Sequence, residues 1–255
     1  MTFSVADFEA FLLILVRITA FVFVAPFFNL KDVPQKVKIG FSLFFAIILF
    51  QIIPLNIISY QGVIGFSTLV IREAIAGLIL GFFTNISYYI LAFAGHMMDM
   101  EIGFSMVNEL DPVTNIQTTI TSNYYSYIIM LLMLVSNLHH YIIIAIADTF
   151  KMIPLGGAKI NPNLYELMVH FMVDYFIIGF RIILPVFAAT LIANVILAIL
   201  AKIAPQMNMF VIGLQLKVLI GLSILLLIVG LIPTVSDFIF DEMIRMMRLA
   251  IEAIR

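Results

Sequence analysis

The chain has 255 residues, of which 64% are hydrophobic and 11% are charged, and its formal net charge is −2. Apolar runs of about twenty residues in such a composition predict membrane-spanning helices rather than a soluble globular domain. The nearly balanced charge argues against a nucleic-acid partner, and the lack of cysteine excludes disulfides, thiol catalysis and cysteine-bound metals.

The first segment predicts a helix that runs from Ser4 to about Phe28, with Ser4 and Asp7 capping its start. Because no basic residue precedes the apolar run, we expect this helix to be retained and not cleaved as a signal peptide. Arg17 lies in its middle, and a buried arginine is costly unless it is paired, so it indicates a face turned toward protein. The loop 29–38 is the most basic in the chain, which predicts a cytoplasmic loop and an external N-terminus.

A long apolar helix is predicted at about residues 67–93, and it carries the neighbours Arg72 and Glu73. Either these two residues pair with each other, or they pair with charged groups of a neighbouring subunit. Gly77 and Gly81 form a small-residue face that favours the close approach of another helix, although this spacing also arises by chance in apolar helices.

The stretch 95–123 interrupts the apolar pattern. It contains the acids Asp99, Glu101, Glu109 and Asp111 and no lysine or arginine. Lipid does not satisfy the polar backbone of such a segment, so we expect it to pack in protein or to line water. It is interpreted either as a solvated surface connection or as a gate or lid, because long irregular loops in compact structures are often functional.

Beyond this stretch, residues 124–149 predict one strong helix, in which His139 and His140 lack the spacing and acidic partners of a metal site. Residues 164–200 are too long for one straight span, and Gly179 and Pro185 are expected to kink this segment or to split it into a hairpin. Asp174 and Arg181 share a face of this segment, so each is expected to find a buried partner.

The chain breaks again at residues 202–208, and a last long helix containing Lys217 is predicted at 210–231. From Ser236 the sequence is amphipathic. The apolar stripe of this tail is expected to lie on a membrane or on a partner subunit.

The basic residues are concentrated in the first loop and in the C-terminal tail, which predicts that both face the cytoplasm. With an external N-terminus, this arrangement requires an odd number of crossings. The hydropathy pattern nevertheless shows six long apolar segments. We therefore expect at least one of them to be a hairpin, a re-entrant segment or a helix buried in an assembly. The first candidates are the interrupted second segment and the segment around Pro185.

The motif at 204–210, Ala-Pro-Gln-Met-Asn-Met-Phe, is followed at 213–217 by Gly-Leu-Gln-Leu-Lys. Together they resemble the signature of the FliR/SctT family, the export-gate subunits of flagellar and virulence type III secretion systems. Gln215 stands where the family usually has proline, and Gly213 favours the flagellar branch. The resemblance continues over essentially the full chain, at Arg17, Pro26, Val33-Pro34, Glu73, Gly77, Gly81, Gly95, Asp99, Gly103-Phe104, Asp111-Pro112, Leu138-His139-His140 and Leu184-Pro185.

The resemblance implies an all-α protein of about six long, kinked hydrophobic helices arranged as hairpins within a helical hetero-oligomeric cone. Residues 1–200, including the polar loop 95–123, would form a FliP-like portion, and residues 201–255 a FliQ-like hairpin with the amphipathic tail. The implied partners are FliP-type and FliQ-type subunits, FlhB-type and FlhA-type export proteins, unfolded exported proteins and membrane lipid. The implied location is the flagellar basal body in the inner membrane.

The resemblance also implies a structural and gating role without catalysis, metal or cofactor, with energy supplied by a separate ATPase and the proton gradient. It places a plug loop in the pore, with Gly103 and Pro112 as its hinges and Phe104, Met106 and Val107 as its seal. The further plug residues are Asn108, Glu109, Asp111, Thr114 and Gln117. The residues expected to serve assembly are Gly77, Gly81, Pro205, Gln206, Asn208, Phe210, Gly213 and Lys217, and those expected in buried charge pairs are Arg17, Glu73, Asp174 and Arg181.

Two other classes of protein compete with this interpretation. A small-molecule secondary transporter would use Arg17, Glu73, Asp174 and Arg181 as a relay at the membrane midplane, but such carriers tend to show internal repeats, and none is evident here. An intramembrane enzyme would need a metal motif, a nucleophile arrangement or paired carboxylates, and the sequence shows none of these.

Overall fold

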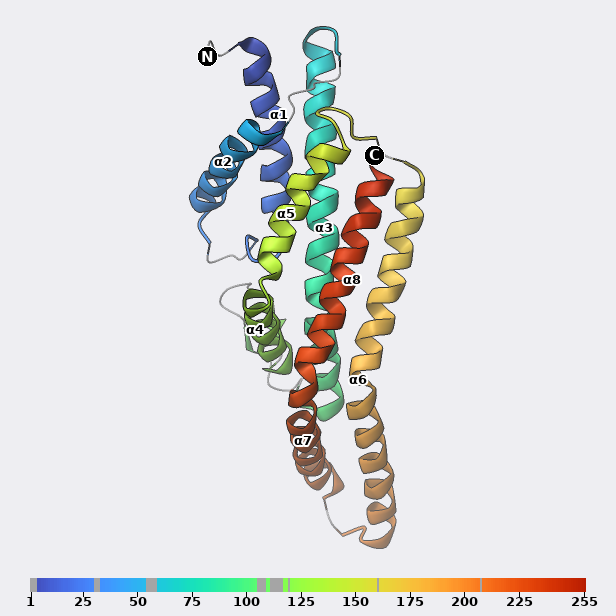
Figure 1. Cartoon of the computed structure of the whole chain (residues 1–255). Helices are drawn as coiled ribbons and strands as arrows, with labels where there is room; N and C mark the ends of the chain where they lie inside the picture. The colour runs from blue at the N-terminus through green and yellow to red at the C-terminus, as the bar shows by residue number, and fades with distance from the viewer. Residues whose placement is uncertain are drawn as a thin grey trace. The chain divides into compact units, whose positions relative to one another are not determined.

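The computed structural model describes residues 4–29, 33–53, 59–104, 109–110, 117–118, 120–159, 161–206 and 208–255 (Figure 1). Within these residues the chain forms eight α-helices, one short 3-10 helix and one pair of two-residue strands. In chain order they are α1 (Val5–Val22), α2 (Gln35–Ile52), α3 (Gly62–Ile102), β1 (Glu109–Leu110), β2 (Gln117–Thr118), α4 (Ile120–Val135), α5 (Leu138–Met152), α6 (Asn163–Ile203), α7 (Met209–Ile228), η2 (Val229–Leu231) and α8 (Ile232–Ala253).

The prediction of an all-α membrane-type protein is confirmed. Four described segments are long and apolar enough to cross a membrane, namely Gln35–Ile52, Gly62–Ile102, Asn163–Ile203 and Val211–Ala253. The bent pair α4 and α5 gives a fifth if it is counted as one span. This number is lower than the six apolar segments of the hydropathy pattern.

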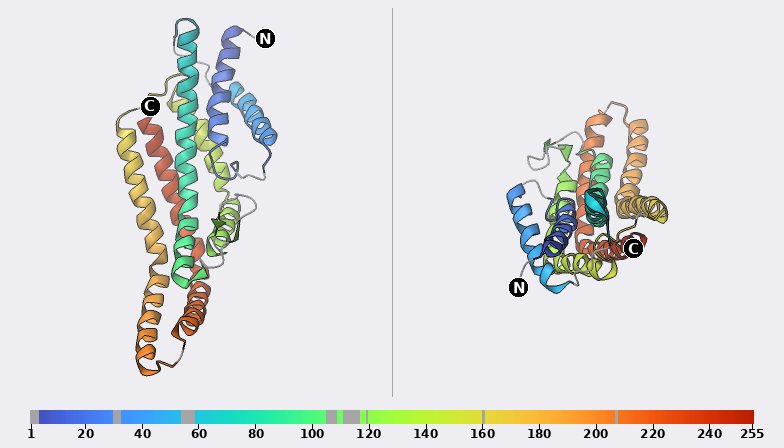
Figure 2. Two further views of the ribbon diagram at one scale, coloured as in Figure 1. Left: turned by 180° about the vertical axis from the view of Figure 1, so that it is seen from behind. Right: turned by 90° about the horizontal axis from the view of Figure 1, so that it is seen from above.

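Helix α1 begins where the sequence places it and ends earlier. Ser4 and Asp7 form the predicted capping box, with each side chain bonded to the backbone N–H of the other residue. The helix stops at Val22, six residues before the predicted end at Phe28, and turns follow up to residue 29. Pro26 lies in these turns, and Phe27 has a left-handed φ of 69°. In both side views α1 and α2 lie next to each other as a hairpin (Figures 1 and 2).

Helix α3 is 41 residues long and extends to Ile102, past the predicted end near residue 93. The first part of the polar stretch is therefore helical, which corrects its interpretation as a loop from residue 95 onward. The reason lies in its apolar positions, because Met98 and Ile102 are four residues apart and both are fully buried. The irregular connection begins only at Gly103.

Two predicted helices differ from the observed ones in where the helix is interrupted. The helix expected at 124–149 is interrupted between α4 and α5, because Asn137 adopts a left-handed conformation with φ 57° that no helix continues through. Conversely, α6 runs unbroken over 41 residues with Pro185 inside it, so of the two expected alternatives, a kink or a hairpin, the hairpin is wrong. A proline removes only one helical hydrogen bond, and a chain reversal would have required a turn that the flanking apolar residues do not supply.

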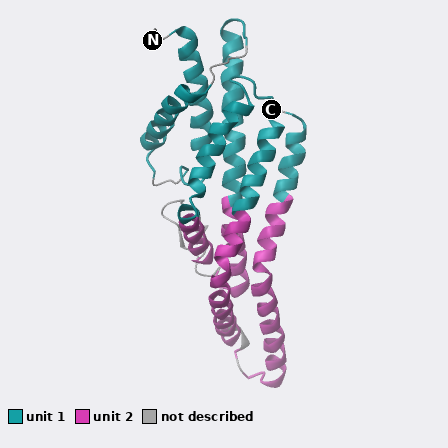
Figure 3. Ribbon diagram, viewed as in Figure 1, with its two compact units in different colours: residues 1–87, 133–172, 240–255 teal, residues 88–132, 173–239 magenta. Residues whose placement is uncertain are grey.

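The chain packs as two compact units, each described separately (Figure 3). The first contains residues 1–87, 133–172 and 240–255, and so includes α1, α2, α5, the beginnings of α3 and α6, and most of α8. Its core is apolar and aromatic. Fully buried members are Leu13, Ile14, Ile18, Phe21, Leu80, Phe83 and Phe171.

In the first unit, the apolar stripe of α8 packs against its own chain. The stripe consists of six residues, of which Ile244 is half-buried and the others are buried, namely Phe240, Met243, Met247, Ile251 and Ile254. The expectation that this stripe would lie on a membrane or a partner subunit is therefore corrected. The end of α8 is held by a backbone hydrogen bond of 2.9 Å from the N–H of Lys159 to the carbonyl of Ile254.

The second unit contains residues 88–132 and 173–239, and so includes the end of α3, most of α4, most of α6, and α7 with η2. Phe93 packs edge-on or tilted against Tyr175, Phe176 and Phe180 of α6. A Cβ at Gly179 would lie 2.5 Å from the Phe93 ring, so this glycine allows α3 and α6 to approach closely.

Candidate functional site

The two ends of the polar loop are joined by a buried carboxylate. Asp99, in the last turn of α3, is fully buried and accepts a hydrogen bond of 2.8 Å from the backbone N–H of Thr121. The hydroxyl of Thr121 donates a second, short hydrogen bond to the same carboxylate. Thr121 lies in the first turn of α4, where backbone N–H groups have no helical partner and a negative charge is favoured. We call the pair Asp99 and Thr121 the clasp.

A close contact between helices α3 and α4 continues from the clasp toward the middle of each helix. A Cβ on Gly95 would lie 2.7 Å from the Cα atom of Ser122, so only glycine permits this approach. The hydroxyl of Ser122 donates to the carbonyl of Ala92 at 2.8 Å, and the hydroxyl of Tyr88 donates to the carbonyl of Ser126 at 3.2 Å. The segments that enter and leave the loop are therefore fixed to each other by backbone contact and side-chain hydrogen bonds.

Between its fixed ends, the loop folds back on itself. Strands β1 and β2 pair antiparallel, with Glu109 opposite Thr118 and Leu110 opposite Gln117. The chain leaves α3 at Gly103, whose φ of 97° is in the region that favours glycine, and a Cβ there would meet no atom within 4 Å. Backbone conformation, not space, is thus what requires glycine at this position.

Phe104 follows at the foot of the loop and is half-buried. It lines a cavity of about 430 Å³ together with Tyr124 and Tyr125 of α4 and Leu222 and Leu225 of α7.

The structure places only some of the predicted plug residues. Gly103 and Phe104 lie at the exit of α3, and Glu109 and Gln117 lie in the paired strands. Met106, Val107, Asn108, Asp111, Pro112 and Thr114 lie outside the described residues. Their roles as seal, hinge and plug stay predictions.

The acids at the end of α3 accept hydrogen bonds within the chain. Asp99 is bonded to Thr121, as described above, and Glu101 accepts a hydrogen bond of 3.4 Å from the hydroxyl of Thr190 on α6. Because no lysine or arginine lies between residues 73 and 150, hydroxyl and amide donors take the place of cations here. The clasp itself was not predicted from the sequence.

A second polar cluster lies in the first unit, around Arg17. Its guanidinium forms a two-pronged ion pair with Glu73, at 2.5 Å from Nε and 2.9 Å from Nη2, and both side chains are fully buried. Nη1 also donates to the hydroxyl of Thr149 at 3.2 Å, and Nη2 to the carbonyl of Ile153 at 3.4 Å. The guanidinium carbon lies 4.1 Å from the centre of the Phe150 ring.

Glu73 completes this cluster by accepting a hydrogen bond of 2.6 Å from the backbone N–H of Gly156. A buried ion pair is stable only if its remaining donors and acceptors are satisfied, and here they are. The cluster connects α1, α3, α5 and the turn after α5. Helix α1 also packs on the small-residue face of α3, since a Cβ on Gly77 would lie 2.9 Å from Ala20 and one on Gly81 would lie 2.9 Å from Val24.

The other predicted charge pairs have a different environment. Arg72 is exposed, and its neighbour Glu73 pairs with Arg17. In this chain Arg181 is exposed and Asp174 is half-buried. Arg181 lies on the outer face of α6, next to the exposed Phe180 and Leu184, and its buried pairing stays a prediction.

The motif after α6 forms a turn. Helix α6 ends at Ile203, and α7 starts at Met209, where the N–H of Ile212 bonds to the carbonyl of Asn208 at 3.2 Å. Pro205 and Gln206 are exposed at this turn, and the side chain of Phe210 lies outside the described residues. On α7, a Cβ at Gly213 would lie 3.3 Å from Leu197 of α6, and Lys217, one turn further, is half-buried.

A model of the bacterial export proteins, family 1, matches residues 8–243 of the chain. The chain is 32% identical over 255 residues to the flagellar biosynthetic protein FliR of Bacillus subtilis (strain 168), covering 96% of both chains. It is 28% identical to the protein of the same name from Aquifex aeolicus (strain VF5), covering 94% of this chain and 92% of the relative. The FliR protein of Escherichia coli (strain K12) is 26% identical, with 91% and 89% covered.

Proposed function

The chain belongs to the bacterial export proteins, family 1, and from this premise we propose that it is a structural and gating subunit of the flagellar type III protein export channel. Its relatives over nearly the full length are named flagellar biosynthetic proteins, which supports the flagellar system over a virulence system. The role is one of assembly and gating, and no catalytic step is assigned to the chain.

The observation that carries the gating role is the clasp at the foot of the polar loop. Asp99 and Thr121 hold the two ends of the loop together, and Gly95 lets the backbone of Ser122 approach. A loop tied at its base can change its own conformation while the helices around it stay in place. This is the property required of a plug that closes a channel and yields to an unfolded polypeptide.

The composition of the loop supports the same proposal. Between Gly103 and Thr121 it is rich in threonine and asparagine and carries no cation. Exchanging a protein hydrogen bond for one with water costs on the order of 1 kcal/mol, so such a loop is displaced more readily than one held by apolar burial. In this proposal Gly103 and Pro112 are the hinges, and Phe104, Met106 and Val107 form the seal.

The apolar helices indicate a protein of the inner membrane. Helices α3 and α6 have 41 residues each, a length of about 60 Å, which is about twice the thickness of the hydrocarbon core. Part of each helix must therefore lie outside lipid, which supports burial in an assembly. Four described segments, or five with the bent pair α4 and α5, are candidates to cross the membrane, and the proposed orientation has an external N-terminus and a cytoplasmic C-terminus.

The proposed assembly is a closed cone with FliP-type and FliQ-type subunits, joined by FlhB-type and FlhA-type export proteins. Residues 1–200 are the proposed FliP-like portion, and residues 201–255 the FliQ-like portion. Gly213 and Lys217 then lie on a helix that would face neighbouring subunits. The turn at Pro205 and Gln206 would shape the hairpin that joins α6 to α7.

The test removes the loop and follows leakage and export together. In a strain that carries the chain without residues 109–119, we expect higher permeability of the inner membrane to small molecules and continued secretion of flagellar subunits. A control chain, in which the exposed Ala198 of α6 is changed to Leu, should keep both properties. An unchanged leak in a correctly assembled complex would show that the loop is only a surface connection.

A strain that lacks the whole chain tests the export role itself. We expect it to secrete no flagellar subunits and to recover secretion when the full chain is supplied. Normal secretion without the chain would contradict the proposed function, whatever the loop does.

A further inference from the structure

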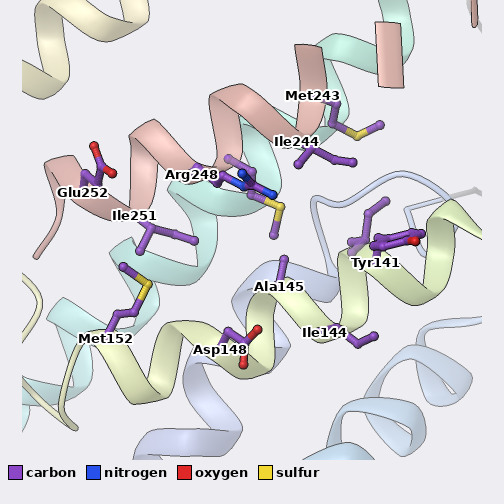
Figure 4. A pocket seen from close by; sticks show the side chains of 12 residues that line it. Tyr141, Ile144, Ala145, Asp148, Met152, Met243, Ile244, Arg248, Ile251 and Glu252 are labelled. Atoms are coloured by element: carbon purple, nitrogen blue, oxygen red, sulfur yellow. The ribbon is translucent and has the colours of Figure 1, made fainter. Parts of the chain in front are cut away.

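A groove in the first unit remains unused by the gating role. It lies between α5 and α8, has a volume of about 350 Å³ and is open to the outside (Figure 4). On α5 it extends from Tyr141 to Met152, a distance of about 16 Å, or about three helical turns. This length matches the contact made by side chains at positions i, i+3 or i+4, and i+7 of a helix laid in a groove.

The floor of the groove is apolar and adaptable. Ala145 of α5 leaves room between the two helices, and Ile251 of α8 points into the same space (Figure 4). Met152 of α5, which is 39% exposed, lines the rest together with Met243 and Met247 of α8, which are buried in their own unit. Methionine side chains are unbranched and polarizable, so they adjust to the shape of a packed partner.

The rim of the groove is charged on both sides. Asp148 of α5 is about half exposed and forms an ion pair of 2.7 Å with Lys151. Arg248 and Glu252 of α8 are exposed, and neither forms an ion pair with any residue that the structure describes. The rim therefore offers one cation and one anion, a helical turn apart, above an apolar floor.

These charges decide against lipid as the occupant. Carboxylates and guanidinium groups in hydrocarbon cost several kcal/mol each, so they are not expected beside an acyl chain. The outward face of α8 carries Asp241 and Arg245 in addition to Arg248 and Glu252. This face is thus suited to water or to polar protein, while the apolar stripe of α8 is already buried in its own unit.

We propose that the groove between α5 and α8 binds the apolar face of an amphipathic helix from an unlike subunit of the export complex. The partner helix places a carboxylate against Arg248 and a basic side chain against Glu252, and its apolar side chains enter the space above Ala145. The charges fix its direction and register, and the exposed apolar side chains of α5, Tyr141, Ile144 and Met152, supply the packing. This inference rests on the proposed function, because it requires a hetero-oligomer.

The test uses the full chain in living cells with a photoreactive probe. Tyr141, which is 60% exposed and lines the groove, is replaced by p-benzoyl-phenylalanine, an aromatic residue that forms covalent bonds on irradiation. We expect a crosslink to a different polypeptide, and mass spectrometry should locate it in an apolar segment flanked by an acidic and a basic residue.

Two variants and one control examine the groove itself. Ala145→Leu fills the floor without removing a side-chain contact, and Arg248→Glu reverses the rim charge. Each should lower the crosslink yield about fivefold or more, because a rim charge pair contributes up to about 1 kcal/mol and its reversal adds repulsion. Arg255→Glu makes the same charge change two residues after the end of α8, outside the groove, and should leave the yield unchanged.

The outcomes separate this inference from the proposed function. A crosslink only to lipid, only to a second copy of the chain, or to nothing, in cells that secrete flagellar subunits normally, overturns the inference and leaves the export role intact. A crosslink whose yield is the same in all three variants also overturns it. Failure of the export role would appear separately, as normal secretion in cells that lack the chain.

Discussion

The two buried polar clusters of the molecule solve the same problem in different ways. In the first unit, Arg17 and Glu73 bury a full positive and a full negative charge, and the remaining donors go to Thr149, Ile153 and Gly156. In the second unit, Asp99 buries a carboxylate whose partners are the hydroxyl and backbone N–H of Thr121.

The difference between the clusters lies in what remains when one partner is lost. Without Glu73, a guanidinium that is never neutral stays in an apolar interior. Without the Thr121 hydroxyl, the carboxylate of Asp99 still accepts the hydrogen bond from the backbone N–H of residue 121. The first cluster is therefore suited to a permanent junction of helices, and the second to a junction next to a segment that must rearrange.

The largest effect is expected from Glu73→Gln. It leaves the Arg17 charge uncompensated, which should lower the free energy of unfolding by about 3–5 kcal/mol. The melting temperature of the purified protein in detergent, and its abundance in cells, would measure the loss. Arg72→Gln, at the exposed neighbouring position, should change little. Equal stability of the two variants would mean that the ion pair is not what holds these helices together.

Replacing both Arg17 and Glu73 tests whether the loss of stability comes from the unpaired charge. The double variant Arg17→Leu with Glu73→Leu removes the charges together, so it should be more stable than Glu73→Gln alone. A double variant less stable than the single one would show that the pair contributes more than mutual neutralisation.

Gly95→Ala should have the next largest effect, at the clasp. The added Cβ would meet backbone atoms of Ser122, which have no rotamer with which to move aside. Overpacking of this kind costs about 1–3 kcal/mol. Gly40→Ala in α2 is the matched control, because a Cβ there meets nothing within 4 Å, and it should stabilise the helix by about 0.4–1 kcal/mol. Comparable melting temperatures for the two variants would refute the close approach of α3 and α4.

A comparable effect is expected when the clasp is opened directly. Thr121→Val keeps the shape and removes one donor, and Asp99→Asn removes the charge. Hydrogen bonds to charged groups contribute about 1.5–3 kcal/mol. Because both changes remove parts of the same interaction, together they should cost less than the sum of the single costs. Thermal unfolding of the four proteins of this cycle measures the coupling. Strictly additive costs would show that the two side chains act independently.

The smallest effect is expected at Asp7, a solvent-accessible carboxylate that caps the start of α1 as Asp99 caps the start of α4. Hydrogen bonds with the backbone N–H and the side chain of Ser4 lower the pKa of Asp7 below its ordinary value. A lowered pKa means that this cap stabilises α1 at neutral pH and that its contribution fades as the pH falls below about 4. Amide exchange at the start of α1 should therefore speed up in acid, and Asp7→Asn should abolish that pH dependence.

Sequence patterns predicted the features of the structure that depend only on residues close together in the chain. The capping box of Ser4 and Asp7 and the all-helical class follow from short-range patterns. The burial of Arg17 in protein follows from the cost of a charge among apolar residues. These features need no knowledge of which distant segments meet.

Features that depend on distant contacts were not predictable in this way. Asp99 and Thr121 are 22 positions apart, and an acid with no nearby base gives no sign that a threonine will satisfy it. Asn137 breaks a helix because it adopts a left-handed conformation, which asparagine tolerates but does not require. Pro185 stays within a helix, although proline often ends one.

The lack of lysine and arginine around the loop also determines how a protease acts on the chain. Trypsin cuts after these residues, so it leaves residues 73–151 as a single fragment that contains the whole loop. A lysine introduced between β1 and β2 would create the only tryptic site in that fragment. Because Gly95 and Asp99 hold α4 against α3, the two halves of a chain cut there should stay associated, and the cut would report directly on the accessibility of the loop.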